Sequence, residues 1–256
     1  MAHPLPVTHL VVDVGNSRIK WGLCDAVAVT ACAGLPPDDP DAWQQQLAAW
    51  GLTGPLRWTV SGVHPARRQR LADWLRERGD TVELVTAPGQ LPLQTALPHP
   101  DKAGIDRLLN AVAVNSRRRP GVPAVAVDAG SAVTVDYVDE HGIFRGGAIL
   151  PGLRLMAQAL HDYTALLPVV AVDGPAAMPG ASTSEAIKAG VLAAVLGGIE
   201  RLIGTLERAA PAGAVQVFLA GGDGGLLACH LTRSAEHWPA MTLEGLRLTA
   251  KQLMTP

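Results

Sequence analysis

The residues most able to do chemistry lie in two short turns of similar sequence. Asp13-Val14-Gly15-Asn16-Ser17 and Asp128-Ala129-Gly130-Ser131-Ala132 each follow an apolar run and combine a carboxylate, a glycine and a short polar side chain. Glycine lets the backbone approach an anion, and backbone N–H groups and hydroxyls can donate to that anion. Because Mg²⁺ is usually held by one or two carboxylates together with phosphate oxygens and water, the two turns predict a site for nucleotide phosphates and magnesium. A single turn of this kind would be explained as the end of a hairpin, whereas two copies heading two half-chains favour nucleotide binding.

A third candidate is the helix start at Gly104-Ile105-Asp106-Arg107. Two interpretations of this segment remain open. In the first, Asp106 complements the dipole at the N-terminus of the helix and Arg107 pairs with it or with a neighbour. In the second, Asp106 is a general base that accepts a proton from an alcohol, and Arg107 is a fork for a substrate carboxylate. The same residue types at the same spacing serve both interpretations.

Composition and missing motifs exclude several other classes of protein. The 256 residues are 48% hydrophobic and 17% charged with a net charge of -2, which is typical of a globular protein and not of one held to nucleic acid by bulk charge. The sequence has no P-loop, Rossmann, serine-hydrolase or HExxH pattern. The three cysteines contain no C-x-x-C pair and predict neither a disulfide framework nor a zinc site. The basic segment Arg67-Arg68-Gln69-Arg70 lacks interleaved aromatic residues and is interpreted as a solvated helix face.

The sequence also predicts a protein without a membrane-spanning segment. The longest uncharged apolar run, Ala189 to Ile199, is well short of the roughly 20 residues that a bilayer helix needs. The first residues lack the basic and apolar regions of a signal peptide. We therefore expect a cytoplasmic protein that binds neither a membrane nor nucleic acid.

The elements that must position the two turns alternate between strand and helix patterns. Strand patterns occur at His9–Asp13, Arg18–Leu23, Leu56–Val60, Thr81–Val85, Pro123–Asp128, Val133–Val138 and Val215–Leu219. Helix patterns occur at Pro40–Trp50, Pro65–Arg78, Ile105–Arg118, from Pro151 to about His161, from Ser182 to about Arg208, and at Leu226–Leu231 and Leu243–Met254. This interleaving predicts an α/β protein with mixed sheets that are flanked by helices on both faces. The break at Arg117–Gly121 predicts two related domains, residues 1–119 and residues 120–256.

These motifs resemble those of the type III pantothenate kinases, a family within the acetate kinase, sugar kinase, heat-shock protein and actin superfamily. Asp13–Gly22 is similar to the first phosphate motif of the family, Gly104–Arg107 to its Gly-x-Asp-Arg substrate motif and Asp128–Asp136 to its second phosphate motif. Gly146–Gly152 and Ser182–Gly190 match further family motifs in the same order. The resemblance implies two ribonuclease H-like (actin-like ATPase) domains with a cleft between them. It also implies phosphorylation of pantothenate to 4'-phosphopantothenate by ATP, the first step of coenzyme A biosynthesis.

The resemblance also implies roles for individual residues. ATP would be bound by Asp13, Val14, Gly15, Asn16, Ser17, Arg18, Ile19, Lys20, Ser131, Gly221 and Gly222. Pantothenate would be bound by Leu97, Gly104, Ile105, Asp106, Arg107 and Thr183, with Asp106 as the catalytic base. Asp13 would lie near Mg²⁺, and Asp128 would hold a monovalent cation, K⁺ or NH₄⁺. The expected assembly is a homodimer in which Thr183 reaches the substrate of the partner subunit.

The sequence departs from the family pattern at two positions and leaves two other functions open. Leu97 stands where the family commonly has a tyrosine, which puts one substrate hydrogen bond in doubt, and Ala220 replaces a more usual threonine before Gly221. The alternatives to a pantothenate kinase are a kinase for another small alcohol and a non-catalytic regulatory protein of the same fold. Small residues on the apolar helix that includes Ala189, Gly190, Ala193, Ala194, Gly197 and Gly198 would allow another helix to approach closely in a dimer.

Overall fold

The computed structural model describes residues 9–211 and 213–254 and divides into two compact units. Unit 1 consists of the chain up to Gln94, Pro98–Ser116 and the chain from Ala240 onward. Unit 2 consists of Thr95–Leu97 and Arg117–Pro239. The first break, at Ser116, lies close to the predicted boundary at residue 119. The last residues differ from the prediction, because they belong to unit 1 and not to the second domain.

Unit 1 is built on a five-stranded sheet in the order β3-β2-β1-β4-β5. Strand β1 pairs with β2 in the antiparallel direction and with β4 in the parallel direction. The elements of the unit are β1 (His9–Val14), β2 (Ile19–Cys24), β3 (Val29–Leu35), α1 (Pro40–Ala49), β4 (Arg57–Gly62), α2 (Pro65–Glu77), β5 (Thr81–Leu84), η1 (Pro88–Gln90), η2 (Pro100–Lys102), α3 (Ile105–Arg117) and α7 (Met241–Leu253). The short strand β6 (Gln94–Thr95) lies at the junction with unit 2.

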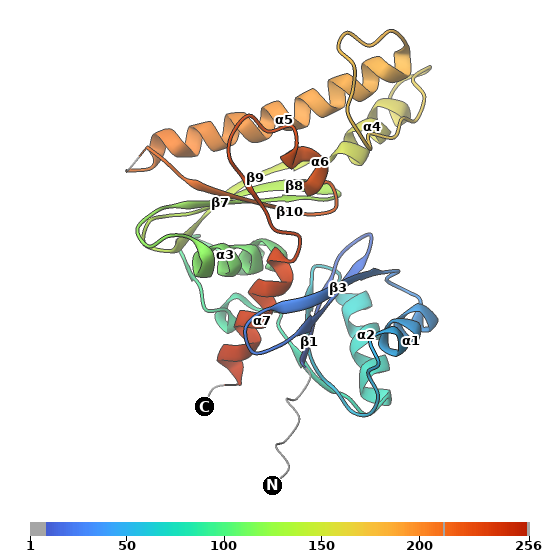
Figure 1. The fold of residues 1–256 in the computed structure, drawn as a ribbon, viewed down its shortest axis with the longest axis vertical. Helices are drawn as coiled ribbons and strands as arrows, with labels where there is room; N and C mark the ends of the chain where they lie inside the picture. The colour runs from blue at the N-terminus through green and yellow to red at the C-terminus, as the bar shows by residue number, and fades with distance from the viewer. Residues whose placement is uncertain (1–8, 212, 255–256) are drawn as a thin grey trace. The chain divides into compact units, whose positions relative to one another are not determined.

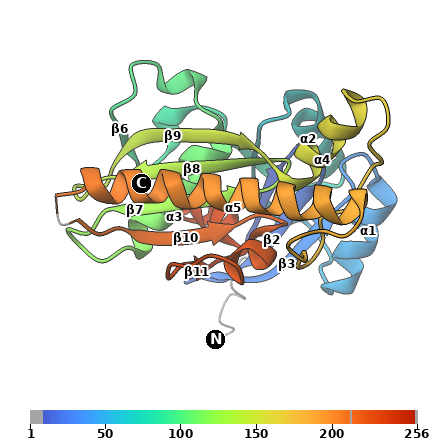
Figure 2. The same cartoon turned by 90° about the horizontal axis from the view of Figure 1, so that it is seen from above.

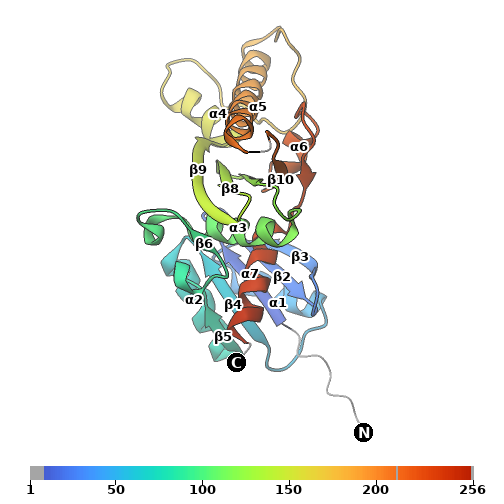
Figure 3. The same cartoon turned by 90° about the vertical axis from the view of Figure 1, so that its left-hand side faces the viewer.

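The sheet of unit 1 is covered by helices on both faces because its central strand is apolar on both sides. Leu10, Val12 and Val14 belong to a core cluster that also contains residues of α1 and α2. On the opposite face, α7 contacts β1, β2 and β4, as Figure 3 shows. Gly22 leaves room on this face for the side chain of Leu243. These contacts make α7 an internal part of unit 1, which explains why the unit boundary differs from the prediction.

Unit 2 repeats the same arrangement with a further edge strand. Its six strands are ordered β11-β10-β7-β8-β9-β6, so β7, β8, β9, β10 and β11 correspond in position and direction to β1, β2, β3, β4 and β5. The elements are β7 (Ala124–Ala129), β8 (Ala132–Val138), β9 (Ile143–Pro151), α4 (Leu153–Asp162), α5 (Thr183–Ala209), β10 (Gln216–Ala220), α6 (Gly224–Ala228) and β11 (Glu236–His237). The predicted pair of related α/β halves with mixed sheets is therefore confirmed.

Helix α5 covers one face of the sheet of unit 2 (Figures 1 and 2). It begins with a capping box between Ser182 and Glu185, as the predicted N-cap requires. Ile187, Val191 and Val195 recur along one stripe of the helix and belong to the core cluster of the unit.

Helix α5 also bears on the prediction that no segment spans a membrane. By length and composition it can cross a membrane, with a mean hydropathy of 1.5 over its most apolar window, of which 33% is buried. The prediction counted only the run Ala189 to Ile199, whereas the apolar character extends through the isolated charges Lys188 and Glu200. Core helices of soluble proteins meet the same criterion, and the buried stripe of α5 packs on the sheet in that manner.

Candidate functional site

The first turn connects β1 and β2 and places Asp13 at the end of the central strand of unit 1. Asp13 is 7% exposed and lies opposite Lys20 in the antiparallel register, so the carboxylate and the ammonium group come from adjacent strands. The N–H of Gly15 donates to the carbonyl of Arg18 at 3.0 Å, which closes the turn, and Asn16 and Ser17 are exposed at its tip. The turn therefore presents backbone N–H groups and short polar side chains beside one carboxylate and one cation.

The second turn connects β7 and β8 and places Asp128 near the end of the central strand of unit 2. The N–H of Gly130 donates to the carbonyl of Ala132 at 2.9 Å, so this turn is one residue tighter than the first. Ser131 is exposed at its tip, and its carbonyl accepts from the N–H of Gly152 at 3.0 Å. A side chain at Gly152 would lie 2.1 Å from the carbonyl oxygen of Gly130. Gly152 therefore allows the start of α4 to support the turn directly.

The glycines after β10 lie beside the second turn. Ala220 pairs with Asp128, and Gly221 follows with φ +91° and no room for a side chain against the backbone of Ala129. The N–H of Asp223 donates to the carbonyl of Ala129 at 3.0 Å. Burial raises the pKa of Asp223, and the nearby Arg154 opposes the shift. Asp223 was not among the predicted site residues, because its position next to the turn depends on the parallel pairing of β10 with β7.

The third predicted segment forms the start of α3 in unit 1. Oδ1 of Asp106 accepts from the N–H of Arg107 at 2.8 Å, and the carbonyl of Gly104 accepts from the same N–H at 3.1 Å. A side chain at Gly104 would lie 2.5 Å from Oδ1 of Asp106. Glycine is therefore needed for the carboxylate to fold back over the helix start. Both Asp106 and Arg107 remain partly exposed.

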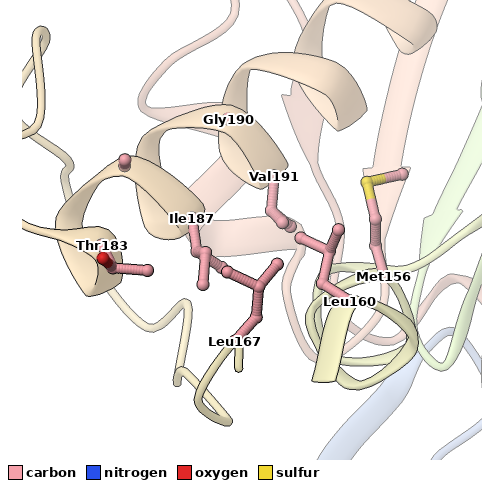
Figure 4. Close-up of a pocket in the computed structure, with 8 residues that line it drawn as sticks. Met156, Leu160, Leu167, Thr183, Ile187, Gly190 and Val191 are labelled. Carbon is pink, nitrogen blue, oxygen red and sulfur yellow. The ribbon is translucent and has the colours of Figure 1, made fainter. Parts of the chain in front are cut away.

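The other two residues predicted to bind substrate lie in unit 2. Leu97 packs against Gly146, where a side chain would lie 3.2 Å from Cδ2 of Leu97, and Gly146 has φ +92°. Thr183 is the first residue of α5 and contributes to an apolar pocket of about 440 Å³ between α4 and α5 (Figure 4). Met156 and Leu160 of α4 face Ile187 and other residues of α5 across this pocket. The residues that line the pocket are apolar apart from Thr183, and none of them is charged.

The carboxylates of the described residues fit a metal that is bound mainly through nucleotide and water. Within residues 9–211 and 213–254, no group of three or more His, Cys, Asp and Glu side chains could hold a metal ion by itself. Asp13 and Asp128 each lie near the end of a strand, beside a turn that presents backbone donors. A single carboxylate that is completed by phosphate oxygens and water is the coordination that Mg²⁺ commonly uses with nucleotides.

Solved structures define the class of fold to which the chain belongs. A putative Baf family transcriptional activator from Campylobacter jejuni is 19% identical, with a TM-score of 0.64 over 95% of this chain and 98% of its own. A putative 2-dehydro-3-deoxygalactonokinase from Sinorhizobium meliloti is 16% identical, with a TM-score of 0.58 over 97% of this chain and 100% of its own. These likenesses and the sheet order confirm the predicted actin-like and sugar-kinase fold.

Sequence relatives define the family. The family profile described as type III pantothenate kinase matches residues 9–205. The type III pantothenate kinase of Alkalilimnicola ehrlichii is 34% identical over 95% of this chain and 98% of its own length, and that of Herminiimonas arsenicoxydans is 35% identical over 94% and 96%. The chain belongs to the type III pantothenate kinase family and is a kinase, as the resemblance of its motifs predicted.

Proposed function

We propose that this protein transfers the γ-phosphoryl group of ATP to the primary hydroxyl of pantothenate in the cytoplasm and forms 4'-phosphopantothenate for coenzyme A biosynthesis. The observation that carries the proposal is the family match over residues 9–205, which includes both turns and the start of α3. The geometry of these segments supports the proposal, because together they provide the groups that phosphoryl transfer needs. The two turns offer backbone donors for phosphate and one carboxylate each for a cation, and the start of α3 offers a carboxylate within reach of solvent.

We assign ATP binding to residues 13–20, Ser131, Gly221 and Gly222. The position of Lys20 opposite Asp13 supports a role in neutralising phosphate charge. The exposed tips of the two turns support hydrogen bonding to phosphate oxygens. When bound, Mg²⁺ beside Asp13 would withdraw charge from the phosphates, and K⁺ or NH₄⁺ beside Asp128 would add further positive charge.

We assign pantothenate binding to Leu97, the segment Gly104–Arg107 and Thr183. Arg107 supplies a guanidinium that can form two parallel hydrogen bonds to the carboxylate of the substrate. Asp106 accepts the hydroxyl proton as the oxygen attacks phosphorus. Leu97 supplies an apolar contact where a tyrosine hydroxyl is common in the family, so this chain is expected to hold that part of the substrate with one hydrogen bond fewer.

We further propose a homodimer formed through the α4–α5 side of unit 2. Of the small residues predicted on α5, the exposed ones are Gly190, Ala193, Ala194 and Gly197. Ala189 is buried, and a side chain at Gly198 would lie 3.2 Å from Cδ1 of Leu150. Large apolar side chains are also exposed in the segment that connects α4 to α5. They are Tyr163 at 88%, Leu166 at 92%, Val169 at 59% and Met178 at 75%. A monomer rarely leaves so many large apolar side chains of one region in water.

The experiment that tests the proposed function is the release of ADP from ATP with and without pantothenate. We expect turnover that depends on pantothenate and on a divalent cation, with a further increase on addition of K⁺ or NH₄⁺. A panel of other small alcohols tests the alternative of a different kinase substrate. Absence of ADP formation with every alcohol, despite nucleotide binding, would support the regulatory alternative and overturn the proposal.

A further inference from the structure

The side chain of Arg67 in α2 reaches the first turn, between β1 and β2. Its Nε donates to Oδ2 of Asp38 at 3.0 Å, in the connection between β3 and α1, and its Nη1 donates to the carbonyl oxygen of Asn16. Its side chain is 26% exposed, whereas that of Arg70, whose Nη1 lies 3.4 Å from Oδ1 of Asp38, is 54% exposed. The prediction of a solvated basic face is therefore wrong for Arg67. It is also wrong for Arg68, whose Nη1 donates to the carbonyl of Gly62 at 2.6 Å.

The bond from Arg67 to Asn16 acts on the peptide group that links Asn16 to Ser17. Because a trans peptide is planar, its C=O and N–H point in opposite directions, so fixing the carbonyl of Asn16 also fixes the direction of the Ser17 N–H. A charged donor on the carbonyl also polarises the peptide and strengthens its N–H as a donor. The tip of the turn is exposed from Asn16 to Arg18, which means that core packing does not hold this peptide in place.

Asp38 gives Arg67 a defined orientation. The Asp38 carboxylate accepts a hydrogen bond from Nε of Arg67, while Nη1 of the same rigid guanidinium donates to the carbonyl oxygen of Asn16. An exposed ion pair by itself contributes little to stability, so the significance of Asp38 lies in the direction that it imposes on the guanidinium. Lysine carries the same charge but a single ammonium group, and it cannot hold both partners in a fixed plane.

We propose that Arg67 is a positioning residue for phosphoryl transfer: held by Asp38, it orients the Asn16–Ser17 peptide so that the Ser17 N–H is directed at a phosphate of ATP. This inference rests on the proposed assignment of residues 13–20 to ATP. It gives a function to a basic segment that neither the phosphate motifs nor the substrate motif includes, and it places that function on a helix outside both.

The test compares Arg67→Ala, Arg67→Lys and Asp38→Asn with the control Arg76→Ala, which removes the same charge from the same helix at a residue that pairs with Asp73 and not with Asp38. The affinity for a non-hydrolysable ATP analogue is measured by calorimetry, and kcat and both KM values are measured with ATP and pantothenate. We expect Arg67→Ala to raise the Kd of the analogue and the KM for ATP about tenfold, the low end expected for a charged hydrogen bond, and to leave the KM for pantothenate within about twofold of wild type. Arg67→Lys should resemble Arg67→Ala, Asp38→Asn should show a smaller change in the same direction, and Arg76→Ala should match wild type.

Three results would overturn the proposal. The first is wild-type nucleotide affinity in Arg67→Ala. The second is full recovery in Arg67→Lys, which would show that charge alone suffices. The third is an equal loss in Arg67→Ala and Arg76→Ala, which would show a general electrostatic effect. If Arg67→Ala does not fold, as judged by its thermal transition, Arg67→Lys and Asp38→Asn carry the same test through the two KM values. Failure of the wild-type protein to bind ATP or to phosphorylate pantothenate would instead overturn the proposed function, so the two outcomes are distinguishable.

Discussion

Asp106 occupies a position in which one carboxylate can serve both the helix start and the proposed catalysis. Its Oδ1 accepts from the N–H of Arg107, which is a helix-start interaction, and Gly104 provides the space for this geometry. The same side chain is partly exposed, as a group that receives a proton from a substrate must be. The two interpretations that the sequence left open are therefore compatible with each other, and they are separated by a substitution that preserves one and removes the other.

Asp106→Asn is expected to lower kcat by roughly 10²–10⁴-fold with little change in stability, because asparagine still accepts a hydrogen bond from a backbone N–H but cannot act as the base. Steady-state kinetics and a thermal melt measure the two effects. Nucleotide affinity should remain at the wild-type value, since the two turns assigned to ATP are unchanged. Near-normal turnover with pantothenate would show that Asp106 only caps the helix or orients Arg107.

His9 predicts a loss of stability in mild acid. Burial, followed by the nearby charges of Arg57 and Arg247, lowers the pKa of His9 from 6.5 to about 4, and Nε2 shares a hydrogen bond of 2.9 Å with Oγ1 of Thr59. Between pH 6.5 and about pH 4, His9 binds a proton in the unfolded chain but not in the folded chain. The free energy of unfolding therefore falls as the pH falls. The contribution of His9 to this decrease is about 3 kcal/mol between pH 7 and pH 4.

Urea denaturation at pH 7 and at pH 4 measures the free energy of unfolding of wild type and of His9→Gln. Glutamine keeps a polar partner for Thr59 but does not titrate. The wild type should lose about 3 kcal/mol more than His9→Gln on acidification. His141→Gln is the matched control, because it removes a histidine whose side chain is 71% exposed and leaves the contacts of His9 unchanged. Equal pH dependence of wild type and His9→Gln would show that His9 is protonated equally in the folded and unfolded states.

At the scale of secondary-structure elements, the contact between α7 and α3 is close enough to be sensitive to one methyl group. A Cβ at Gly245 would lie 1.9 Å from the carbonyl oxygen of Leu109, and Oγ1 of Thr242 donates to Oδ1 of Asn110 at 2.8 Å in the same contact. Gly245→Ala should therefore separate the helices and lower the free energy of unfolding by about 2–3 kcal/mol. Chemical denaturation measures the loss.

Gly34→Ala is the matched control for this prediction. Gly34 lies in β3 of the same unit, and a Cβ there would meet no atom within 4 Å. We expect the stability of this variant to equal or slightly exceed that of wild type, because alanine loses less backbone entropy on folding. A loss in Gly34→Ala as large as that in Gly245→Ala would mean that the cost does not arise at the α7–α3 contact.

Elements with strong local signals could be predicted from the sequence, and elements that depend on distant partners could not. The helix from Ser182 was predicted within one residue at each end because it has an N-cap and a regular apolar stripe. Strand β3 was not predicted, since its residues Val29–Leu35 are mostly small and only half-buried. Strand β9 contains Gly146 and Gly147, which weaken a strand signal, and it was not predicted either.

The same distinction applies to the candidate site. The two turns were predicted because each carries its glycine, carboxylate and polar residue within a few positions. The contact of Arg67 with Asn16 joins residues 51 positions apart, so only the fold places them together. The hydrogen bond from the N–H of Asp223 to the carbonyl of Ala129 depends in the same way on the pairing of β10 with β7.

At the scale of the whole molecule, the proposed homodimer predicts that one charge on α5 is enough to prevent assembly. Ala194 is exposed in the single chain, so Ala194→Glu should leave the fold of one subunit unchanged while burying an unpaired carboxylate in the dimer. Light scattering at micromolar concentration should show a dimer for wild type and a monomer for this variant. Ala194→Ser adds no charge and should remain dimeric, and a monomeric wild type would contradict both the dimer and the assignment of Thr183 to a partner's substrate.

The contribution of α7 to unit 1 has a consequence for biosynthesis. Residues up to Gln94 leave the ribosome long before Met241–Leu253, while all of unit 2 is made in between. The face of β1 and β2 that α7 covers, including the space beside Gly22, therefore stays uncovered until Met241–Leu253 has been synthesised. Unit 2 can reach its native contacts before that point, whereas unit 1 must wait for α7. During that interval the nascent chain exposes an apolar sheet surface of the kind that chaperones bind.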